Sequence, residues 1–270
     1  MSEQKGEMSF WDHLEELRWT IFRCIIALVV FTLGCLALLY YFYDEFILAP
    51  TRADFILYEL LCKVTSSVPF LPDFCDTSYL VKIFNVSLTG PFFTYMSSSF
   101  WMALIMTFPY LVYEIWRFVL PALYPHEKKS VRWVFSSGTV MFFIGCAVGY
   151  FLVFPLTVRF LATFRLSPAI DIQSSLEDYM GMFWLMIFIM GLVFELPLLA
   201  WLLSQIGILK RSFFKKYRRH AIVGLLIAAA IITPSGDPFT LSVVFLPLYG
   251  LYEISAFFVK KDVKAPDEDT

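Results

Sequence analysis

The chain has 270 residues, of which 59% are apolar, 19% aromatic and only 16% charged, and its mean hydropathy is +0.70. Soluble domains are about 45–50% apolar and about 25% charged, so this composition excludes an ordinary soluble globule. The scarcity of charge excludes a disordered chain, and the net charge of −2 excludes a general nucleic-acid binder. The composition therefore predicts an all-α polytopic membrane protein.

The membrane spans are predicted from apolar runs of about 20 residues, the length that a helix needs to cross ~30 Å of hydrocarbon. Four runs reach this length, at residues 21–43, 100–119, 133–154 and 179–203. Two further runs, 221–232 and 239–259, are separated by a break at residues 234–238 and should form a hairpin. We expect six transmembrane helices, the fifth and sixth short, in a single membrane domain of residues 1–260. A flexible cytoplasmic tail should follow at residues 261–270.

The basic residues predict the orientation of the chain. If the N-terminus is cytoplasmic, most of the 21 Lys and Arg residues lie inside, and the only ones outside are Arg52, Lys63, Lys82, Arg159 and Arg165. Lys and Arg concentrate in short cytoplasmic loops, so both termini are expected in the cytoplasm. The first apolar run is longer than the apolar region of a cleaved signal peptide and should remain as an anchor.

Two segments outside the spans have predicted structure of their own. Ser9 followed by Asp12 resembles a capping box, so residues 1–20 should contain an interfacial helix that turns into the first span. Residues 44–99 should form an outer cap loop, within which residues 51–64 favour a lateral helix.

Three carboxylates are candidate functional groups. Glu16 precedes the first span and Glu127 begins the third, although a solvated polar face and a helix cap are plain alternatives for them. Glu195 lies within the fourth span, where a charge at the bilayer centre costs about 2.5–3.5 kcal/mol, so a functional role is favoured. The alternative is a structural hydrogen bond at a helix that Pro197 kinks.

The sequence contains no recognisable catalytic or metal-binding motif, which predicts that the chain is not an enzyme and uses no cofactor. Cys24, Cys35 and Cys146 are interpreted as small apolar residues of the spans. Cys62 and Cys75 would pair only in an oxidising compartment, and the unpaired alternative is preferred.

A series of short motifs runs along nearly the whole chain. They are His13-Leu-Glu-Glu-Leu-Arg18, Ala49-Pro50, Pro91-Phe-Phe-Thr94, Phe118, Pro121-Ala-Leu-Tyr124, His126-Glu127, Tyr150, Val153-Phe-Pro155, Phe194-Glu-Leu-Pro197, Thr233-Pro234, Asp237 and Tyr252-Glu253-Ile254. In this order the motifs resemble those of the TatC family, the multispanning receptor subunit of the twin-arginine protein translocase. The resemblance is weakest between Arg52 and Gly90, and Ser97, Lys128, Lys129 and Thr240 depart from residues common in relatives.

The resemblance implies a concave, glove-like shell in the bacterial inner membrane. It implies that the chain binds twin-arginine signal peptides of folded precursor proteins and works by the proton-motive force. Single-span TatA- and TatB-type subunits, membrane lipid and further copies of the chain are the implied partners, with no nucleic acid among them.

The resemblance also assigns residue roles by position. Glu16, Glu127, Arg18 and Phe118 match the signal-peptide site, Glu195 matches the acid of the membrane groove, and Pro50 matches a functional loop residue. Thr233, Asp237 and Thr240 are expected at the contact with the partner helix. Carboxylates suit a paired-arginine ligand, because a guanidinium binds a carboxylate through two parallel hydrogen bonds that Lys cannot reproduce.

Two alternatives to a receptor are a proton-coupled transporter that uses Glu195 as its proton carrier and a membrane-embedded hydrolase. The lack of visible repeats and the short fifth helix disfavour the transporter. The missing nucleophile and metal motifs disfavour the hydrolase.

Overall fold

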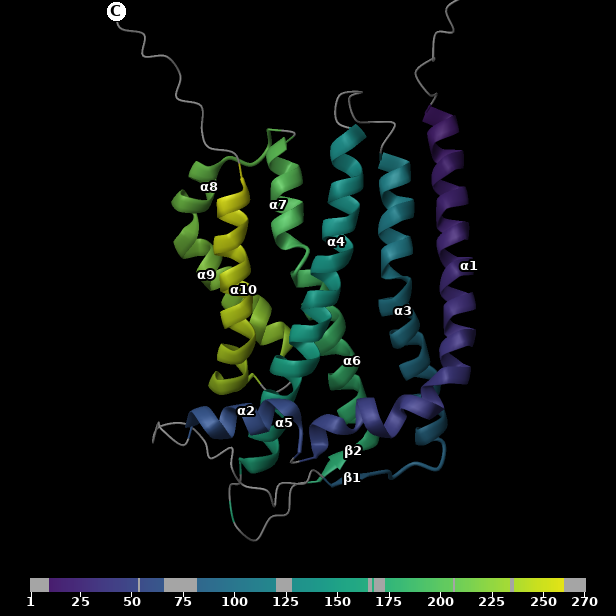
Figure 1. The fold of residues 1–270 in the computed structure, drawn as a ribbon, viewed down its shortest axis with the longest axis vertical. Coiled ribbons are helices and arrows are strands. Elements are labelled where there is room, and N and C mark those ends of the chain that lie inside the picture. Colours follow the sequence, from purple (N-terminus) through teal and green to yellow (C-terminus); the bar gives the residue numbers. More distant parts are fainter. Residues whose placement is uncertain are drawn as a thin grey trace, which may run out of the picture. The chain divides into compact units, whose positions relative to one another are not determined.

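The structure is a computed structural model that describes residues 10–52, 54–65, 82–119, 128–164, 167, 173–205, 207–233 and 236–259. Within these ranges the regular secondary structure is helical apart from one pair of two-residue strands (Figure 1). The helices are α1 (Phe10–Phe42), α2 (Ile56–Thr65), α3 (Gly90–Val119), α4 (Lys128–Val148), α5 (Phe154–Thr163), α6 (Leu176–Val193), α7 (Leu196–Gln205), α8 (Arg211–Lys216), α9 (Arg218–Ile232) and α10 (Pro238–Phe258). The strands β1 (Ile83–Phe84) and β2 (Ser174–Ser175) pair in parallel, with Ile83 opposite Ser174.

The contacts divide the chain into two compact units. The first comprises Met1–Tyr40 and Tyr95–Thr139, and the second comprises Tyr41–Thr94 and Val140–Thr270. Helices α1, α3 and α4 each begin in one unit and end in the other. The contacts within each unit are given in turn below. The expectation of one domain over residues 1–260 stays a prediction.

Four helical runs among the described residues are long and apolar enough to cross a membrane. They are His13–Lys63, which includes α1, and Ser136–Thr163, Leu176–Gln205 and Pro238–Phe258. These runs confirm the first, third, fourth and sixth predicted spans as apolar helices of sufficient length. Helix α10 has 21 residues, so the expectation that the sixth helix is short is wrong, whereas α9 has only 15.

Two predicted boundaries are also wrong. Helix α1 runs without interruption from Phe10 to Phe42, so the expected turn between an interfacial helix and the first span does not exist. Helix α3 begins at Gly90, which removes residues 90–99 from the predicted outer loop. The difference arises at Pro91. Proline is common in loops, but it is equally suited to the first turn of a helix, where no amide hydrogen is needed.

In the first unit, α1 and α3 run antiparallel, side by side (Figure 1). At one end of their contact the Tyr95 hydroxyl donates to the carbonyl of Leu36, and Cys35 Sγ lies 4.0 Å from Met106 Sδ. Away from this contact α1 exposes a broad apolar surface, as expected of a helix surrounded by lipid. Its exposed side chains include Ile25, Ile26, Val29, Val30 and Leu33.

In the second unit, tyrosine hydroxyls bind the segment that follows α1. This segment contains a π-helical turn, Tyr43–Ile47, and a 3₁₀ turn, Ala49–Thr51. Tyr150 donates to the carbonyl of Phe46 at 2.8 Å, and Tyr179 donates to that of Ile47 at 2.7 Å. Carbonyls at the end of a helix lack partners within the helix, so these bonds satisfy groups that would otherwise be buried unpaired.

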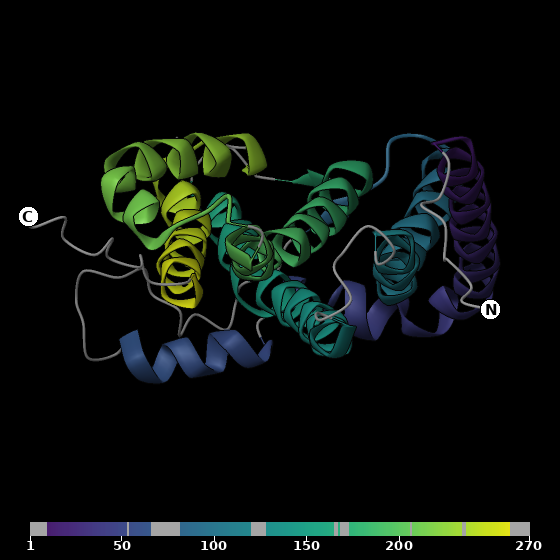
Figure 2. The ribbon, with the colours of Figure 1, turned by 90° about the horizontal axis from the view of Figure 1, so that it is seen from above.

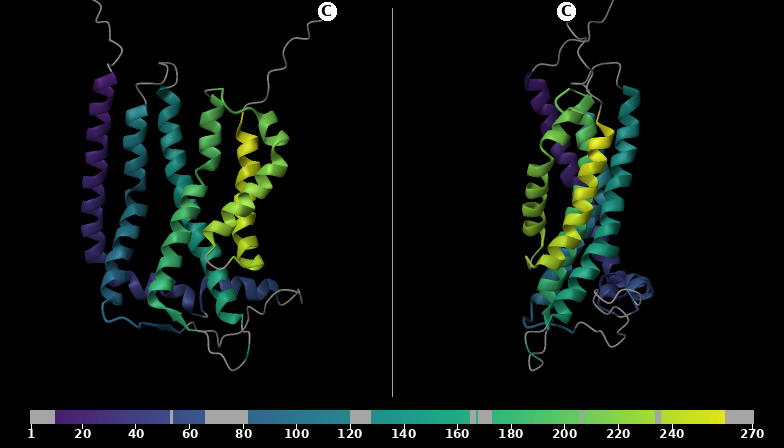
Figure 3. Two further views of the ribbon diagram at one scale, coloured as in Figure 1. Left: turned by 180° about the vertical axis from the view of Figure 1, so that it is seen from behind. Right: turned by 90° about the vertical axis from the view of Figure 1, so that its left-hand side faces the viewer.

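Several helices of the second unit contact α10, among them α5, α7, α8 and α9. Helix α10 packs against α7 and, through the hairpin, against α9 (Figure 2). The predicted lateral helix is confirmed as α2, which lies across the direction of α10 (Figure 3). At the far end of the hairpin, Arg218 pairs with Glu253 at 2.7 Å.

Candidate functional site

The end of α1 nearest the N-terminus contacts the C-terminal end of α3. The rings of His13 and Phe118 stack there, with centroids 4.3 Å apart and planes inclined by 18°. Glu16 follows His13 by three residues and is partly buried. Residues three apart lie on the same face of a helix, so Glu16 stands one turn along from the ring stack, on the side of α1 that faces α3.

Arg18, another candidate residue of this site, does not lie on the same face of α1 as Glu16. Arg18 is exposed, and its guanidinium lies 5.7 Å from the ring centroid of Phe22 on its own helix. Two residues along a helix correspond to a rotation of about 200°, so Arg18 occupies a different face from Glu16. Glu127 lies outside the described residues, so its place relative to Glu16 stays a prediction.

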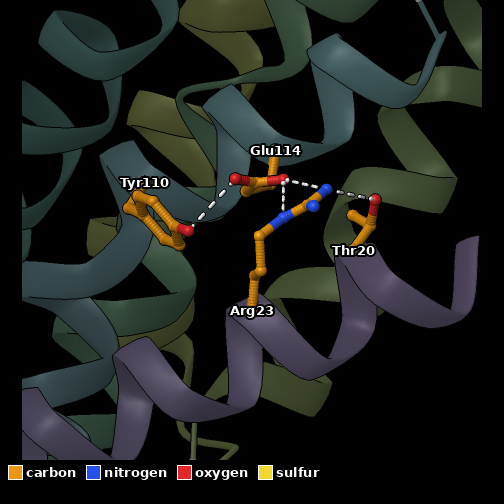
Figure 4. Close-up of polar contacts among 4 residues, drawn as sticks. All are labelled: Thr20, Arg23, Tyr110 and Glu114. Carbon is orange, nitrogen blue, oxygen red and sulfur yellow. Dashed lines mark hydrogen bonds and ion pairs between the residues drawn. The ribbon is translucent and has the colours of Figure 1, made fainter. Parts of the chain in front are cut away.

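A partly buried ion pair lies further along the same contact (Figure 4). Arg23 of α1 donates from Nε to Oε2 of Glu114 of α3 at 3.0 Å, and its Nη2 lies 3.0 Å from the same oxygen. The Tyr110 hydroxyl donates to Oε1 of Glu114 at 3.1 Å, and Arg23 Nη2 donates to Thr20 at 3.2 Å. Glu114 is only 2% exposed.

Sequence reasoning missed this cluster, although a signal for it is present in the sequence. Arg23 and Glu114 are opposite charges within two apolar runs, and charged residues in such runs usually pair with one another.

Glu195 lies where the fourth apolar run is broken. Helix α6 ends at Val193 and α7 begins at Leu196, because Pro197 has no amide hydrogen to continue the α-helical ladder. The Glu195 side chain is partly buried, and its Oε1 is buried with no hydrogen-bond partner among the described residues. The alternative role predicted for Glu195, a structural hydrogen bond, is therefore not supported at its Oε1 atom.

Pro50 is buried in the 3₁₀ turn Ala49–Thr51, where the ring suits the first turn of a helix. Its carbonyl accepts a hydrogen bond from the Tyr58 hydroxyl at 2.9 Å, and the same hydroxyl lies 3.0 Å from the carbonyl of Pro155. The guanidinium of the buried Arg159 lies 4.7 Å from the centroid of the Tyr58 ring. These contacts join Pro50 to both α2 and α5.

The three hairpin candidates have local structural roles. Asp237 is the N-cap of α10, accepting from the backbone amide of Thr240 at 2.8 Å and from its hydroxyl. Thr233 donates to the carbonyl of Ala229 at 2.9 Å. Both threonines are buried within the chain, so a contact with a partner helix stays a prediction.

Of the four described cysteines, three are free thiols, in agreement with their interpretation as small apolar residues of the spans. Cys24, Cys35 and Cys146 are free thiols, with Cys35 and Cys146 buried. Cys62 is disulfide-bonded, so the preferred interpretation of this residue as unpaired is wrong. Cys75 lies outside the described residues.

Comparison with known protein families identifies the family to which this chain belongs. Residues 12–247 match the family described as Sec-independent protein translocase protein (TatC). The chain belongs to the TatC family. It is therefore a TatC-type subunit of a protein translocase, a multi-pass membrane protein with bacterial homologues, and not an enzyme. This membership confirms the resemblance and removes the transporter and hydrolase alternatives.

Individual TatC proteins match this chain over most of their length. The TatC protein of Blattabacterium sp. subsp. Periplaneta americana (strain BPLAN) is 35% identical over 265 residues, which cover 97% of this chain and 99% of the relative. That of Escherichia coli (strain K12) is 31% identical over 246 residues, covering 91% and 86%.

Two crystal structures of the twin-arginine translocase receptor TatC show the same fold. One is 27% identical with a TM-score of 0.65, covering 91% of this chain and 97% of that chain. The other, in DDM, is 26% identical with a TM-score of 0.70, covering 92% and 99%.

Proposed function

We propose that this chain is the receptor that binds twin-arginine signal peptides of folded precursor proteins in a bacterial inner membrane. The observation that carries the proposal is the contact between α1 and α3, where the rings of His13 and Phe118 stack and the partly buried Glu16 follows His13 by one helical turn. A partly buried carboxylate beside an aromatic surface offers hydrogen bonds to a guanidinium and a flat face on which it can stack. Glu127 is the proposed second carboxylate, and Arg18 supports the same site.

The proposed topology has six spans with both termini in the cytoplasm. It adds α3, of 30 residues, and the short α9 to the four apolar helical runs. The concentration of Lys and Arg on one side supports this orientation. The signal-peptide site would then lie at the cytoplasmic face, where a precursor protein first meets the membrane.

We propose that transport also depends on partners outside this chain. Single-span TatA- and TatB-type subunits would dock at the hairpin of α9 and α10 near Thr233, Asp237 and Thr240, with Glu195 lining the membrane groove. Pro50 would keep the segment after α1 in place. Several copies of the chain would assemble in one complex, with transport driven by the proton-motive force.

Crosslinking tests the receptor proposal. A signal peptide with a photoreactive residue beside its arginine pair is irradiated with membranes that contain the full chain. The double variant Glu16→Ala/Glu127→Ala should lose the crosslink while it inserts normally into the membrane. Each charge-assisted hydrogen bond contributes about 1.5–3 kcal/mol, so the two losses together should lower the affinity by at least about a hundredfold.

The matched control is Glu15→Ala. Glu15 is exposed and adjacent in sequence, but it lies about 100° around the helix from Glu16. It should crosslink like the unmodified chain. A crosslink of normal strength in the double variant would exclude Glu16 and Glu127 as the receptor site.

A further inference from the structure

The Arg23–Glu114 pair lies on the same faces of α1 and α3 as the proposed receptor site. His13, Glu16, Thr20 and Arg23 follow one another at intervals of three, four and three residues, which places them along one face of α1. Phe118, Glu114 and Tyr110 are four residues apart along α3, and they meet this face in antiparallel order. Glu16 therefore lies between the ring stack and the ion pair.

The ion pair is a directional contact about two helical turns along α1 from Glu16. The ring stack tolerates sliding, and so does the sulfur contact of Cys35 with Met106. The ion pair does not, because a shift of one helical turn, about 5.4 Å, would separate Arg23 from Glu114. Helices in a membrane lack a hydrophobic driving force for association, so close packing and polar contacts determine their register.

Glu114 cannot serve as a ready acceptor for an arginine of a ligand. Its side chain is 3% exposed, Arg23 binds its Oε2, and Tyr110 binds its Oε1. A guanidinium from outside would have to displace Arg23 and leave that charge unpaired beside an apolar contact. The Arg23 side chain is 35% exposed and shields the carboxylate from the accessible side.

We propose that Arg23 and Glu114 are positioning residues for twin-arginine recognition. Their ion pair fixes the register of α1 against α3, and this register sets Glu16 beside Phe118. The inference rests on the proposed receptor function, and it assigns selectivity for arginine over lysine to the geometry of the contact between the two helices as well as to the carboxylate itself.

The test measures binding of photoreactive twin-arginine and twin-lysine signal peptides to the full chain in membrane vesicles. Arg23→Gln and Glu114→Gln should each weaken binding of the twin-arginine peptide by at least about tenfold, since each leaves one charge unpaired. Each should also reduce the preference for arginine over lysine. The charge exchange Arg23→Glu/Glu114→Arg should restore both the affinity and the preference to within about threefold of the unmodified chain.

Two further variants separate positioning from folding. Arg23→Gln/Glu114→Gln leaves no buried unpaired charge, so it should fold but still show a reduced preference for arginine. Arg117→Gln removes an exposed charge from the same end of α3 and should bind both peptides like the unmodified chain.

Several outcomes would overturn the inference. Unchanged binding by both single variants would exclude a positioning role. Stronger binding by Arg23→Gln would identify Glu114 as a direct acceptor that Arg23 blocks. A charge exchange that folds but fails to regain the arginine preference would also count against it. If the unmodified chain itself shows no preference for arginine, the receptor proposal fails, which is a separate result.

Discussion

Two glutamates in apolar runs of the chain, Glu114 in α3 and Glu195 between α6 and α7, have opposite surroundings. Glu114 has both carboxylate oxygens engaged, by Arg23 and Tyr110, whereas a buried oxygen of Glu195 has no hydrogen-bond partner among the described residues. A satisfied buried carboxylate holds helices together, while an unsatisfied one is available to a ligand or a proton. The same residue type is therefore structural at position 114 and a functional candidate at position 195.

Replacement of Glu195 should separate transport from docking. In Glu195→Ala we expect a loss of precursor transport into inverted vesicles that exceeds any loss of signal-peptide crosslinking, because Glu195 lies outside the α1–α3 contact. Glu59→Gln, an exposed carboxylate of α2, is the control and should leave both readouts unchanged. Equal losses of transport and crosslinking in Glu195→Ala would place the residue in the first recognition step or in the fold.

Tyr58→Phe should destabilise the second unit. The change removes one hydroxyl that lies within bonding distance of the Pro50 and Pro155 carbonyls, and a buried acceptor left unpaired costs about 1–3 kcal/mol. Thermal unfolding in detergent should show a lower midpoint. Tyr217→Phe is the control, since Tyr217 is 40% exposed; an equal fall in both variants would contradict the role of the Tyr58 bond.

At the scale of elements, glycines set how closely α4 and α6 approach. A Cβ added at Gly145 would lie 2.5 Å from the carbonyl oxygen of Met190, and one at Gly191 would lie 2.6 Å from the ring of Phe142. The two backbones are therefore in contact just before the break at Glu195. This close packing fixes the end of α6 from which the Glu195 turn departs.

Gly145→Ala should force the two helices apart. Overpacking of this kind costs about 1–3 kcal/mol, and here the obstacle is backbone that cannot rotate away. Thermal unfolding should reveal the loss. Gly181→Ala, in α6 but with nothing within 4 Å of the added Cβ, should be neutral or slightly stabilising, because alanine favours a helix. Equal stability of Gly145→Ala and Gly181→Ala would show that the crossing can relax.

The helices themselves were largely predictable from the sequence, because an apolar run of about 20 residues has few other structures available in lipid. The boundaries were less predictable. Pro91 and Pro197 are both prolines in apolar surroundings, yet one begins α3 and the other divides α6 from α7. Only the packing of the surrounding chain distinguishes these outcomes.

The candidate site was predictable in part. Phe118 could be assigned by resemblance, but its contact with His13 could not, since the two residues are 105 positions apart and the sequence between them carries no signal of an antiparallel contact. The ion pair of Arg23 with Glu114 is a similar case. Pairing between distant helices depends on register, which a single sequence does not state.

For the whole molecule, the proposed topology predicts which positions can be labelled from each side. A cysteine introduced as Glu59→Cys in α2 should react with a membrane-impermeant maleimide from outside the cell. Lys216→Cys in α8 should react only when the cytoplasmic side is opened, because Lys and Arg residues concentrate there. The unmodified chain measures the background of its native thiols. The reverse pattern of labelling would invert the proposed orientation.

The proline at position 197 has one more consequence for the chain as a whole. Because Pro197 lacks an amide hydrogen, the carbonyl of Val193 has no donor at the position where a continuous helix would supply one. This carbonyl and the buried oxygen of Glu195 place two acceptors close together within an otherwise apolar run. Such groups lower the free energy of water inside a membrane. The fourth span is thus a place where water would enter the bilayer around this protein more readily than along an unbroken apolar helix.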